Sequence, residues 1–334
     1  MNQKTKIAVI GLGTVGQLVH VPILAKLNLV ELVAVSDINK TRLNSVSDKF
    51  NIKNRFTDFT KMFETVEIDA VVISTPTNTH KSIAIECLSK RKHVLIEKPI
   101  GLNLAEAQEI DSEAKKNKCH AMVGMNFRFG PDTMLLKSLI NSGELGDLFY
   151  IKSGWSRKQS SQEKWFNKKN LAGGGVMFDL GVVVIDTALW LLDYPKIKNV
   201  SAQHFYHAIQ NIEDSAVGFI RMNNSAVVNY EASWSFHDEV ESFKLTAYGT
   251  KGTGHLNPLR AYKKMGSNRV DFTSNSSPQT KDLFKKSYEN ELKHFVGAIN
   301  DSVPLISSSS EAISRMKLIE CIYKSANSQS EIEI

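Results

Sequence analysis

A glycine-rich turn and an acidic residue downstream of it are the first residues with recognisable chemistry. Gly11, Gly13 and Gly16 form the pattern G-x-G-x-x-G directly after the apolar run KIAVI. These glycines allow a tight turn, close approach of the backbone to a pyrophosphate, and close packing of the next helix, whose N-terminus favours anions. Asp37 follows about 20 residues later, the spacing of the acid that binds the adenosine ribose. We therefore predict a dinucleotide site formed by Gly11, Gly13, Thr14, Val15, Gly16 and Asp37.

Asp37 also bears on the choice of dinucleotide. A carboxylate at the ribose repels the 2′-phosphate of NADP, so NAD is the predicted cofactor. Lys40 and Arg42 follow closely, and they leave the use of NADP open.

Further polar residues come directly after three other apolar runs. The segment STPTNTH begins at Ser74, Glu97-Lys98-Pro99 ends the run VLIE, and Asn126-Phe127-Arg128 follows AMVG. The carboxyl ends of parallel strands meet at one edge of a sheet, where a dinucleotide lies. An ammonium at the end of an apolar strand also suggests a function for Lys98. We therefore add to the predicted cofactor site Thr75, Pro76, Asn78, His80, Glu97, Lys98 and Arg128, and we expect Asn126 to face the substrate.

Alternating strands and helices must position these residues in the first third of the chain. Short apolar runs at 6–10, 32–36, 70–74, 94–97 and 121–124 alternate with helical stretches such as 80–89 and 104–116. Near-continuous apolar strands separated by helices predict a parallel sheet covered on both faces. The expected fold class is therefore α/β, a doubly wound Rossmann domain, over residues 1–124.

The pattern changes after residue 125. Longer strands are expected at 148–155, 200–207, 215–221, 226–235 and 243–248, and Asn223-Asn224 suits a hairpin turn. A helix is expected at 175–192, closing helices near 287–301 and 309–327, and a polar loop at 266–280. We predict an α+β domain with a large, mostly antiparallel open sheet over 125–334, for substrate binding and oligomerisation.

Composition bounds the class of protein. The chain has 334 residues, 42% of them hydrophobic, with a net charge of +6. The charge is mild and lacks a nucleic-acid-binding motif. The longest apolar candidate, 182–192, is interrupted by Asp186 and falls short of a membrane helix, and the N-terminus lacks the features of a signal peptide. Three unpaired cysteines without ligand spacing indicate buried thiols in a reducing cytoplasm and no metal site.

One segment is locally basic. A single Glu163 stands against Lys152, Arg157, Lys158, Lys164, Lys168 and Lys169. The favoured interpretation is a solvated loop. The alternative is attraction of an anionic cofactor or a nucleotide-sugar.

The motifs occur in an order that resembles the glucose–fructose oxidoreductase and inositol dehydrogenase family, Gfo/Idh/MocA. They are STPTNTH, HVLIEKP, the NFRF segment, and Gly173-Gly174-Gly175 followed by Asp179 and Gly181. The resemblance covers nearly the whole chain. It implies hydride transfer between NAD(P) and a hydroxyl-bearing carbon of a sugar, inositol or sugar derivative. It also implies that Lys98 contacts cofactor and substrate, and that Asp179 lies near the substrate hydroxyls.

The resemblance suggests roles for two further aromatic residues. Similar proteins often carry a tryptophan near the nicotinamide at the position of Trp165, although a packing role is an equal alternative. His20 lies in the first helix, where either a place near the cofactor or a packing role is open.

The chain departs from the family pattern at Val183. Four residues after this aspartate the family usually has His or Tyr for proton transfer, and valine cannot carry a proton. Oxidation of an alcohol needs a base for the hydroxyl proton. Lys98 is our first candidate and Asp186, which lies nearly on the helix face of Asp179, is the second. His207 and His237 are interpreted as ordinary strand or loop residues.

Three functions remain to be weighed at this point. The preferred one is an NAD(P)-dependent dehydrogenase or reductase with Lys98 and Asp179 as catalytic residues and a substrate site that also includes Asn126 and Val183. The alternatives are a dinucleotide-binding sensor and an NAD-assisted glycoside hydrolase. We expect a sugar or polyol as the small-molecule partner, no nucleic acid and no membrane. The family implies a homodimer or homotetramer assembled through the C-terminal sheet.

Overall fold

The computed structural model describes residues 4–161, 163–207, 209–236, 241–273 and 283–334. The chain folds into two compact units. The first comprises Met1–Met125 with Tyr288–Ser314, and the second comprises Asn126–Ser287 with Arg315–Ile334. His237 of the sequence analysis lies outside the described residues.

The first unit contains a six-stranded sheet in which every described pair of strands is parallel. The strand order β3-β2-β1-β4-β5-β6 is that of a Rossmann fold. The strands are β1 (Thr5–Ile10), β2 (Val30–Ser36), β3 (Asn54–Phe56), β4 (Ala70–Ile73), β5 (His93–Glu97) and β6 (Ala121–Gly124). The predicted doubly wound fold is confirmed.

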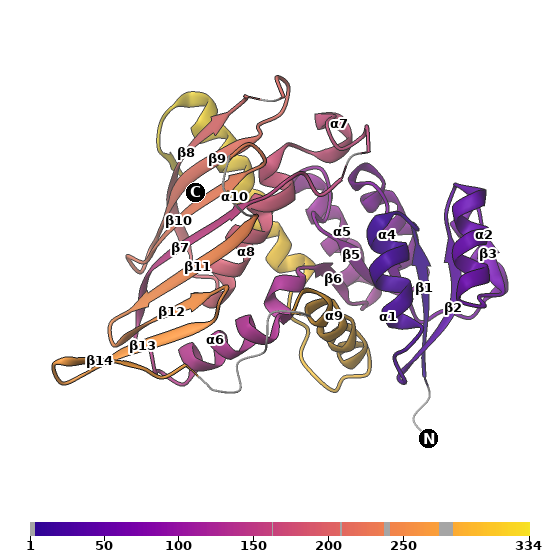
Figure 1. The fold of residues 1–334 in the computed structure, drawn as a ribbon. Coiled ribbons are helices and arrows are strands. Elements are labelled where there is room, and N and C mark those ends of the chain that lie inside the picture. The colour runs from indigo at the N-terminus through magenta and orange to yellow at the C-terminus, as the bar shows by residue number, and fades with distance from the viewer. Residues whose placement is uncertain (1–3, 162, 208, 237–240, 274–282) are drawn as a thin grey trace. The chain divides into compact units, whose positions relative to one another are not determined.

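Helices connect these strands, as Figure 1 shows. A π-helical turn, η1 (Gly16–His20), leads into α1 (Val21–Leu24). The others are α2 (Lys40–Lys49), η2 (Phe59–Lys61), α3 (Met62–Thr65), η3 (Thr77–Thr79), α4 (His80–Ser89) and α5 (Leu104–Asn117). Asn39 and Asn103 cap α2 and α5 by accepting backbone N–H bonds, which fixes where these helices begin.

The C-terminal stretch Tyr288–Ser314 belongs to the first unit because it bonds to that unit's strands. The Val123 N–H donates to the Ser307 carbonyl at 2.8 Å, and the Asn300 amide donates to the Thr5 hydroxyl at 3.2 Å. This stretch includes most of α9 (Leu283–Ile299). The functional division into 1–124 and 125–334 stays a prediction, since it concerns what each part binds.

The second unit contains a nine-stranded sheet in the order β14-β13-β12-β11-β7-β10-β9-β8-β15. Its described strand pairs are antiparallel except for β7 with β10. The strands are β7 (Leu148–Ser156), β8 (Ile197–Phe205), β9 (Ser215–Met222), β10 (Val227–Ser233), β11 (Ser242–Gly249), β12 (Gly252–Leu256), β13 (Arg260–Met265), β14 (Asn268–Asp271) and β15 (Ile332–Glu333). The predicted mostly antiparallel sheet is confirmed.

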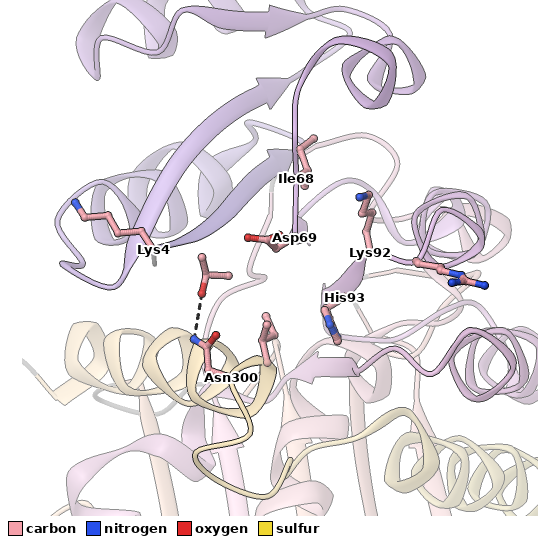
Figure 2. Close-up of a pocket in the computed structure, with 9 residues that line it drawn as sticks. Lys4, Ile68, Asp69, Lys92, His93 and Asn300 are labelled. Carbon is pink, nitrogen blue, oxygen red and sulfur yellow. Dashed lines mark hydrogen bonds between the residues drawn. The ribbon is translucent and has the colours of Figure 1, made fainter. Parts of the chain in front are cut away.

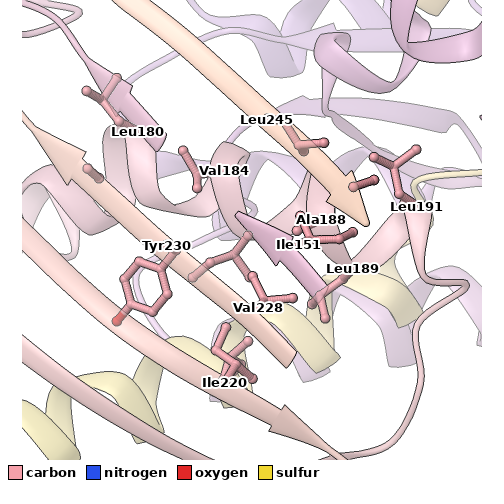
Figure 3. Packing of buried hydrophobic residues seen from close by; sticks show 14 of the residues in the cluster. Ile151, Leu180, Val184, Ala188, Leu189, Leu191, Ile220, Val228, Tyr230 and Leu245 are labelled. Atoms are coloured by element: carbon pink, nitrogen blue, oxygen red, sulfur yellow. The ribbon is translucent and has the colours of Figure 1, made fainter. Parts of the chain in front are cut away.

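Helices cover one face of this sheet (Figure 1). They are α6 (Pro131–Asn141), α8 (Val182–Leu191) and α10 (Ser309–Ser328), with the shorter η4 (Asn126–Phe129) and η5 (Met177–Gly181). The unit also contains the short helix α7 (Lys169–Ala172). Figure 3 shows Val184, Ala188 and Leu189 of α8 packed with side chains of the strands, among them Ile151 and Val228. Burial of each large aliphatic side chain contributes roughly 1.5–3 kcal/mol.

Two expectations for the second unit need correction. The polar loop predicted at 266–280 contains β14, an exposed edge strand whose sequence NRVD has no apolar alternation; residues 274–282 lie outside the described part. The predicted helix 175–192 begins with the π-helical turn η5 and becomes α-helical only at Val182.

Within the described part of the chain, one helical stretch is long and apolar enough to span a membrane by length and composition. This stretch, Lys169–Leu191, is longer than the apolar run recognised in the sequence because it extends through the glycines before α8. Of its most apolar window, 94% is buried inside the protein, as in the core helix of a soluble protein. It is therefore weak evidence for a membrane span.

Candidate active site

The glycine turn after β1 has the geometry of a phosphate-binding turn. Gly11 has a φ of +91°, and a Cβ on it would lie 2.7 Å from the Ser74 carbonyl group. A Cβ on Gly16 would lie 2.2 Å from the Gly11 oxygen. At Gly13, by contrast, the nearest atom would be 3.9 Å away, in the guanidinium of Arg42. Only glycine fits the first two positions, and the third leaves the backbone accessible, which suits a pyrophosphate.

Asp37 is held beside this turn. Its Oδ2 accepts the Leu12 N–H at 2.7 Å, and its Oδ1 accepts the Asn39 N–H at 2.7 Å. The Arg42 guanidinium lies 3.8 Å from Oδ2. The carboxylate is therefore fixed at the end of β2, where an adenosine ribose would lie in a Rossmann fold.

The segment after β4 supports the turn and presents polar groups at the same edge. The Ser74 hydroxyl donates to the Gly11 carbonyl at 2.7 Å. Thr75 and Pro76 are half-buried and Asn78 is exposed, so all three remain available to a cofactor.

His80 is buried, whereas we predicted that it would contact the cofactor. Its ring is 1% exposed, with Nε2 2.9 Å from the Thr75 carbonyl and Nδ1 2.9 Å from the Pro99 carbonyl. Burial lowers its pKa, against the opposing effect of these two carbonyls. Both ring nitrogens face carbonyl oxygens of the two loops, and the neutral ring donates to one of them. We therefore assign His80 a structural role in place of the predicted cofactor contact.

Glu97 also points inward. Its Oε1 lies 2.7 Å from Nε2 of His20, whose side chain is completely buried. Its Oε2 accepts the backbone N–H of Lys98 at 3.3 Å. His20 in turn makes an edge-to-face contact with Tyr288 at 5.8 Å. This pair therefore supports the backbone of Lys98, and His20 has the packing role that the sequence left open.

Lys98 lies where the first unit brings its polar residues together. It directly follows β5, which pairs with β4, and β4 pairs with β1. Because all three strands are parallel, Lys98 and the glycine turn share the carboxyl edge of the sheet. Lys98 is half-buried there.

In the second unit, Asp179 lies in the π-helical turn η5 and is 2% exposed. Its Oδ2 accepts the indole N–H of Trp234 at 3.0 Å and the backbone N–H of Ser160 at 3.1 Å. Val183 is 3% exposed one turn later. The sequence analysis did not identify Trp234 or Ser160, because each lies far along the chain from Asp179.

A buried glutamate packs against the last of the glycines that precede Asp179. The Oε1 of Glu213 accepts the N–H groups of Gly175 and Met177 at 2.9 and 3.0 Å, and the Tyr323 hydroxyl at 2.5 Å. A Cβ on Gly175 would lie 2.1 Å from the backbone carbonyl oxygen of Glu213 and 3.0 Å from its carboxyl carbon. Burial raises the pKa of Glu213 despite these three donors. These hydrogen bonds of Glu213 fix the start of the helical segment just before Asp179. The sequence did not predict them.

Arg128 and Asp186 form a buried ion pair and not a ligand site. Arg128 donates through Nε and Nη2 to the two oxygens of Asp186 at 2.7 and 2.6 Å, and it is 0% exposed. Arg315 and Tyr194 bind the same carboxylate at 2.8 and 2.7 Å. We therefore replace the predicted cofactor contact of Arg128 with a role in the core of this unit.

The remaining predicted residues lie as follows. The Asn126 amide donates to the Ser287 hydroxyl at 2.9 Å, so part of its hydrogen-bonding capacity is used. Trp165 is half-buried and contacts Phe166 at 5.3 Å, edge to face. Phe166 in turn lies 5.8 Å from Trp234.

A hollow of about 330 Å³ lies in the first unit, at the amino edge of the parallel sheet. Figure 2 shows that the labelled Lys4 and Lys92 do not point toward one another across it, while Asp69 contributes a carboxylate. It is lined by Lys4, Thr5, Ile68, Asp69, Arg91, Lys92, His93, Ile299 and Asn300. Because a dinucleotide binds at the opposite, carboxyl edge, this hollow is not the predicted cofactor site.

Cysteine and metal chemistry contribute little to the described part of the chain. Cys87 and Cys321 are buried, Cys119 is half-buried, and all three are free thiols. Burial raises the pKa of Cys87 far above its usual range, which makes it unreactive. In the described residues no three His, Cys, Asp or Glu side chains gather in a way that could hold a metal ion.

Comparison with known proteins agrees with this geometry. Residues 5–125 match the family described as "Oxidoreductase family, NAD-binding Rossmann fold", and residues 133–255 match the "GFO/IDH/MocA C-terminal domain". The chain belongs to the Gfo/Idh/MocA family of oxidoreductases.

Several relatives and structures are similar over almost the whole chain. The scyllo-inositol 2-dehydrogenase (NAD(+)) of Bacillus subtilis (strain 168) is 28% identical, covering 92% of this chain and 90% of the relative. The glucose-6-phosphate 3-dehydrogenase of the same organism is 28% identical, covering 97% of each. A levoglucosan dehydrogenase solved with NADH and L-sorbose has a TM-score of 0.91 at 21% identity, covering 99% of both chains, and shows the shared fold.

Proposed function

We propose that this protein is an NAD(P)-dependent oxidoreductase that transfers hydride between nicotinamide and a hydroxyl-bearing carbon of a sugar, inositol or sugar derivative. The observation that carries the proposal is the position of Lys98 at the carboxyl edge of the sheet, beside the strand that leads from the glycine turn. A pure binding protein has less need of an ammonium at that position. Family membership and relatives named as inositol and sugar dehydrogenases support the reaction class.

The residues of the first unit fit NAD. The accessible backbone at Gly13 would receive the pyrophosphate, and Asp37 would accept the ribose hydroxyls. Thr75, Pro76 and Asn78 would complete the contact at the same edge. Arg42, 3.8 Å from Asp37, partly offsets its charge, so NADP remains a second cofactor. Bound NAD would supply the hydride acceptor for oxidation of an alcohol to a carbonyl group, with release of one proton.

Proton transfer is assigned to Lys98. Val183 has no ionisable group, and Asp186 is a poor base because it is bound by Arg128 and Arg315. Burial by itself would raise the pKa of Asp186, but the two guanidiniums outweigh burial and lower it. Asp179, held by Trp234, would orient a substrate hydroxyl.

Val183 is also the observation that favours a second candidate. A dinucleotide-binding sensor would keep the glycine turn and Asp37 and could lose the usual acid–base residue. An NAD-assisted glycoside hydrolase would need an acid or base beyond Lys98, and the described residues around Asp179 offer none with a clear role.

We further propose a homodimer or homotetramer in the cytoplasm, assembled through the sheet face of the second unit opposite its helices. Tyr150 and Tyr248 stack on that face at 5.3 Å, and strand pairing places Val227 next to Tyr150. Phe219 on β9 also belongs to this face and, like these residues, is partly exposed. Apolar and aromatic side chains on an open sheet face are typical of an interface.

The test of the reaction is the substitution Lys98→Met, which keeps the length of the side chain and removes its charge. We expect turnover to fall by a factor of at least about 10² to 10⁴, the usual contribution of a positioned acid–base group. We expect the dissociation constant for NAD, measured by fluorescence or calorimetry, to change by less than about threefold, since Asp37 and the glycine turn remain. Unchanged turnover in the variant would exclude Lys98 from the chemistry.

A further inference from the structure

A basic loop lies next to Asp179, the carboxylate of the second unit that is predicted to contact the substrate. Over residues 157–161 and 163–169 it carries five cationic side chains, Arg157, Lys158, Lys164, Lys168 and Lys169, and one acidic residue, Glu163. Within the described part of the chain, none of the five forms an ion pair within 4.0 Å. Lys158, Lys164 and Lys168 are exposed. The guanidinium of Arg157 lies 5.5 Å from the Trp155 ring, and the ammonium of Lys169 lies 5.6 Å from the Tyr323 ring.

The loop is attached directly to Asp179. The Ser160 N–H donates to Asp179 at 3.1 Å, and the carboxylate is 2% exposed. The residue just before strand β11 adds one further carboxylate nearby, because Glu241 accepts the Lys158 N–H at 3.0 Å. Among the described residues, five cations and two carboxylates, Glu163 and Glu241, therefore lie along or beside the segment that donates to Asp179, the residue predicted to orient the substrate. An ordinary solvated loop would have no such attachment.

A series of aromatic contacts links the loop to Asp179. Phe166 contacts Trp165 at 5.3 Å and Trp234 at 5.8 Å, and all three are half-buried. The Trp234 indole N–H is the group that donates to Asp179. An aromatic ring offers an apolar face for the C–H groups of a sugar ring, and the indole N–H adds a polar edge.

We propose that the substrate of this protein is an anionic sugar, which carries a phosphate or a carboxylate. The lysines of the loop bind the anionic group, the aromatic side chains contact the ring, and Asp179 receives a hydroxyl. Like charges crowded on one loop repel each other, and an anion relieves that repulsion. This inference rests on the proposed function, because it names the class of sugar that the same site takes.

The experiment measures binding separately from turnover. Quenching of tryptophan fluorescence, in the full-length protein saturated with NAD, gives dissociation constants for glucose 6-phosphate, glucuronate, glucose and methyl glucoside. We expect each anionic sugar that binds to do so at least about tenfold more tightly than its neutral counterpart at 50 mM salt. We expect this ratio to shrink at 500 mM salt, where exposed charges are screened. The ratio for glucose 6-phosphate and the ratio for glucuronate, each against the neutral sugars, show which anionic group the loop prefers.

A double variant tests the loop itself. Lys164→Gln with Lys168→Gln removes two of the exposed charges. Lys317→Gln with Lys324→Gln, on the exposed surface of α10, is the matched control with the same change in net charge. We expect the preference for the anionic sugar to fall at least about fivefold in the first variant and to persist in the control.

The outcomes separate this inference from the proposed function. An anionic preference without formation of NADH would support the loop and contradict the dehydrogenase reaction on those sugars. Turnover of neutral sugars without any anionic preference would support the reaction and overturn the inference. Failure of every anionic sugar to bind, or equal loss of preference in both double variants, also overturns it.

Discussion

At the scale of single residues, the site depends on which way a side chain points at the end of a strand. Glu97 is the last residue of β5 and Lys98 the next, yet Glu97 pairs with the buried His20 while Lys98 is half-buried at the edge. His80 and Arg128 also come directly after strands or turns of the site, and both are almost completely buried. The residues left for ligands are therefore fewer than the polar residues at the strand ends.

A substitution of Asp37 tests the predicted preference for NAD over NADP. We expect Asp37→Ala to raise the dissociation constant for NAD by at least about tenfold, because the ribose loses its acceptor. The constant for NADP should rise less, because the change also removes repulsion of the 2′-phosphate and leaves Arg42 available. Fluorescence titration of both dinucleotides gives the two ratios. Equal weakening of both would refute the ribose assignment.

The sequence could predict residue types at the site but not all their partners. Gly11, Asp37 and Lys98 were predictable because their positions after apolar strands reflect local backbone requirements. The partner of Arg128 is Asp186, 58 residues away, and the indole that holds Asp179 is 55 residues away. Such contacts depend on tertiary packing that spacing along the chain does not encode.

At the scale of elements, the strands with continuous apolar runs were predictable and the polar edge strands were not. β1, β2, β4, β5 and β6 correspond to the five predicted runs. The edge strands β3 and β14 have the polar sequences NRF and NRVD, and β13, next to the edge, is rich in lysine. Edge strands are exposed on one side or more, so no hydrophobic pattern marks them.

A buried histidine between β8 and α10 gives a prediction on pH. Burial, assisted by the ammonium of Lys169, lowers the pKa of His204 to about 4. In the described residues neither ring nitrogen has a hydrogen-bond partner, and the ring lies edge to face on Tyr323 at 4.8 Å. Between pH 6.5 and about 4, the histidine therefore binds a proton more strongly in the unfolded chain than in the folded protein. We expect stability to be complete above pH 6.5 and to fall by roughly 3 kcal/mol as the pH drops to 4.

Urea unfolding at pH 7.5 and pH 4.5 measures this effect. His204→Phe keeps an aromatic ring against Tyr323 and removes the titrating group, so its loss of stability at low pH should be smaller. His207→Gln, at an exposed position, is the control and should behave like the unsubstituted protein. The same loss in His204→Phe and in the control would show that other groups cause the pH dependence.

At the scale of the whole molecule, the prediction concerns assembly through the open sheet face. Phe219 lies on that face, opposite Asn229 in the register of β9 and β10. We expect Phe219→Glu to lower the molar mass seen by light scattering to that of smaller species. Each buried phenylalanine contributes roughly 1.5–3 kcal/mol, and a two-fold interface contains it twice.

Phe219→Leu is the matched control, because it keeps an apolar side chain and should keep the assembled mass. Circular dichroism distinguishes dissociation from unfolding, since the helix and strand content should be retained in both variants. A protein that is monomeric without substitution, or a mass unchanged by the glutamate, would contradict the proposed interface.

The proposed function requires hydride transfer between nicotinamide and a sugar-like substrate despite Val183. Absorbance at 340 nm in a single turnover tests it most directly, with stoichiometric protein and NAD mixed with inositols, hexoses, sugar phosphates and nucleotide-sugars. The reverse panel uses NADH with keto-sugars. We expect absorbance to rise with at least one member of the first panel, or to fall with one of the second, and we expect this change to be lost in Lys98→Met. No change with any compound, in protein shown to bind NAD, would contradict the dehydrogenase and favour the sensor.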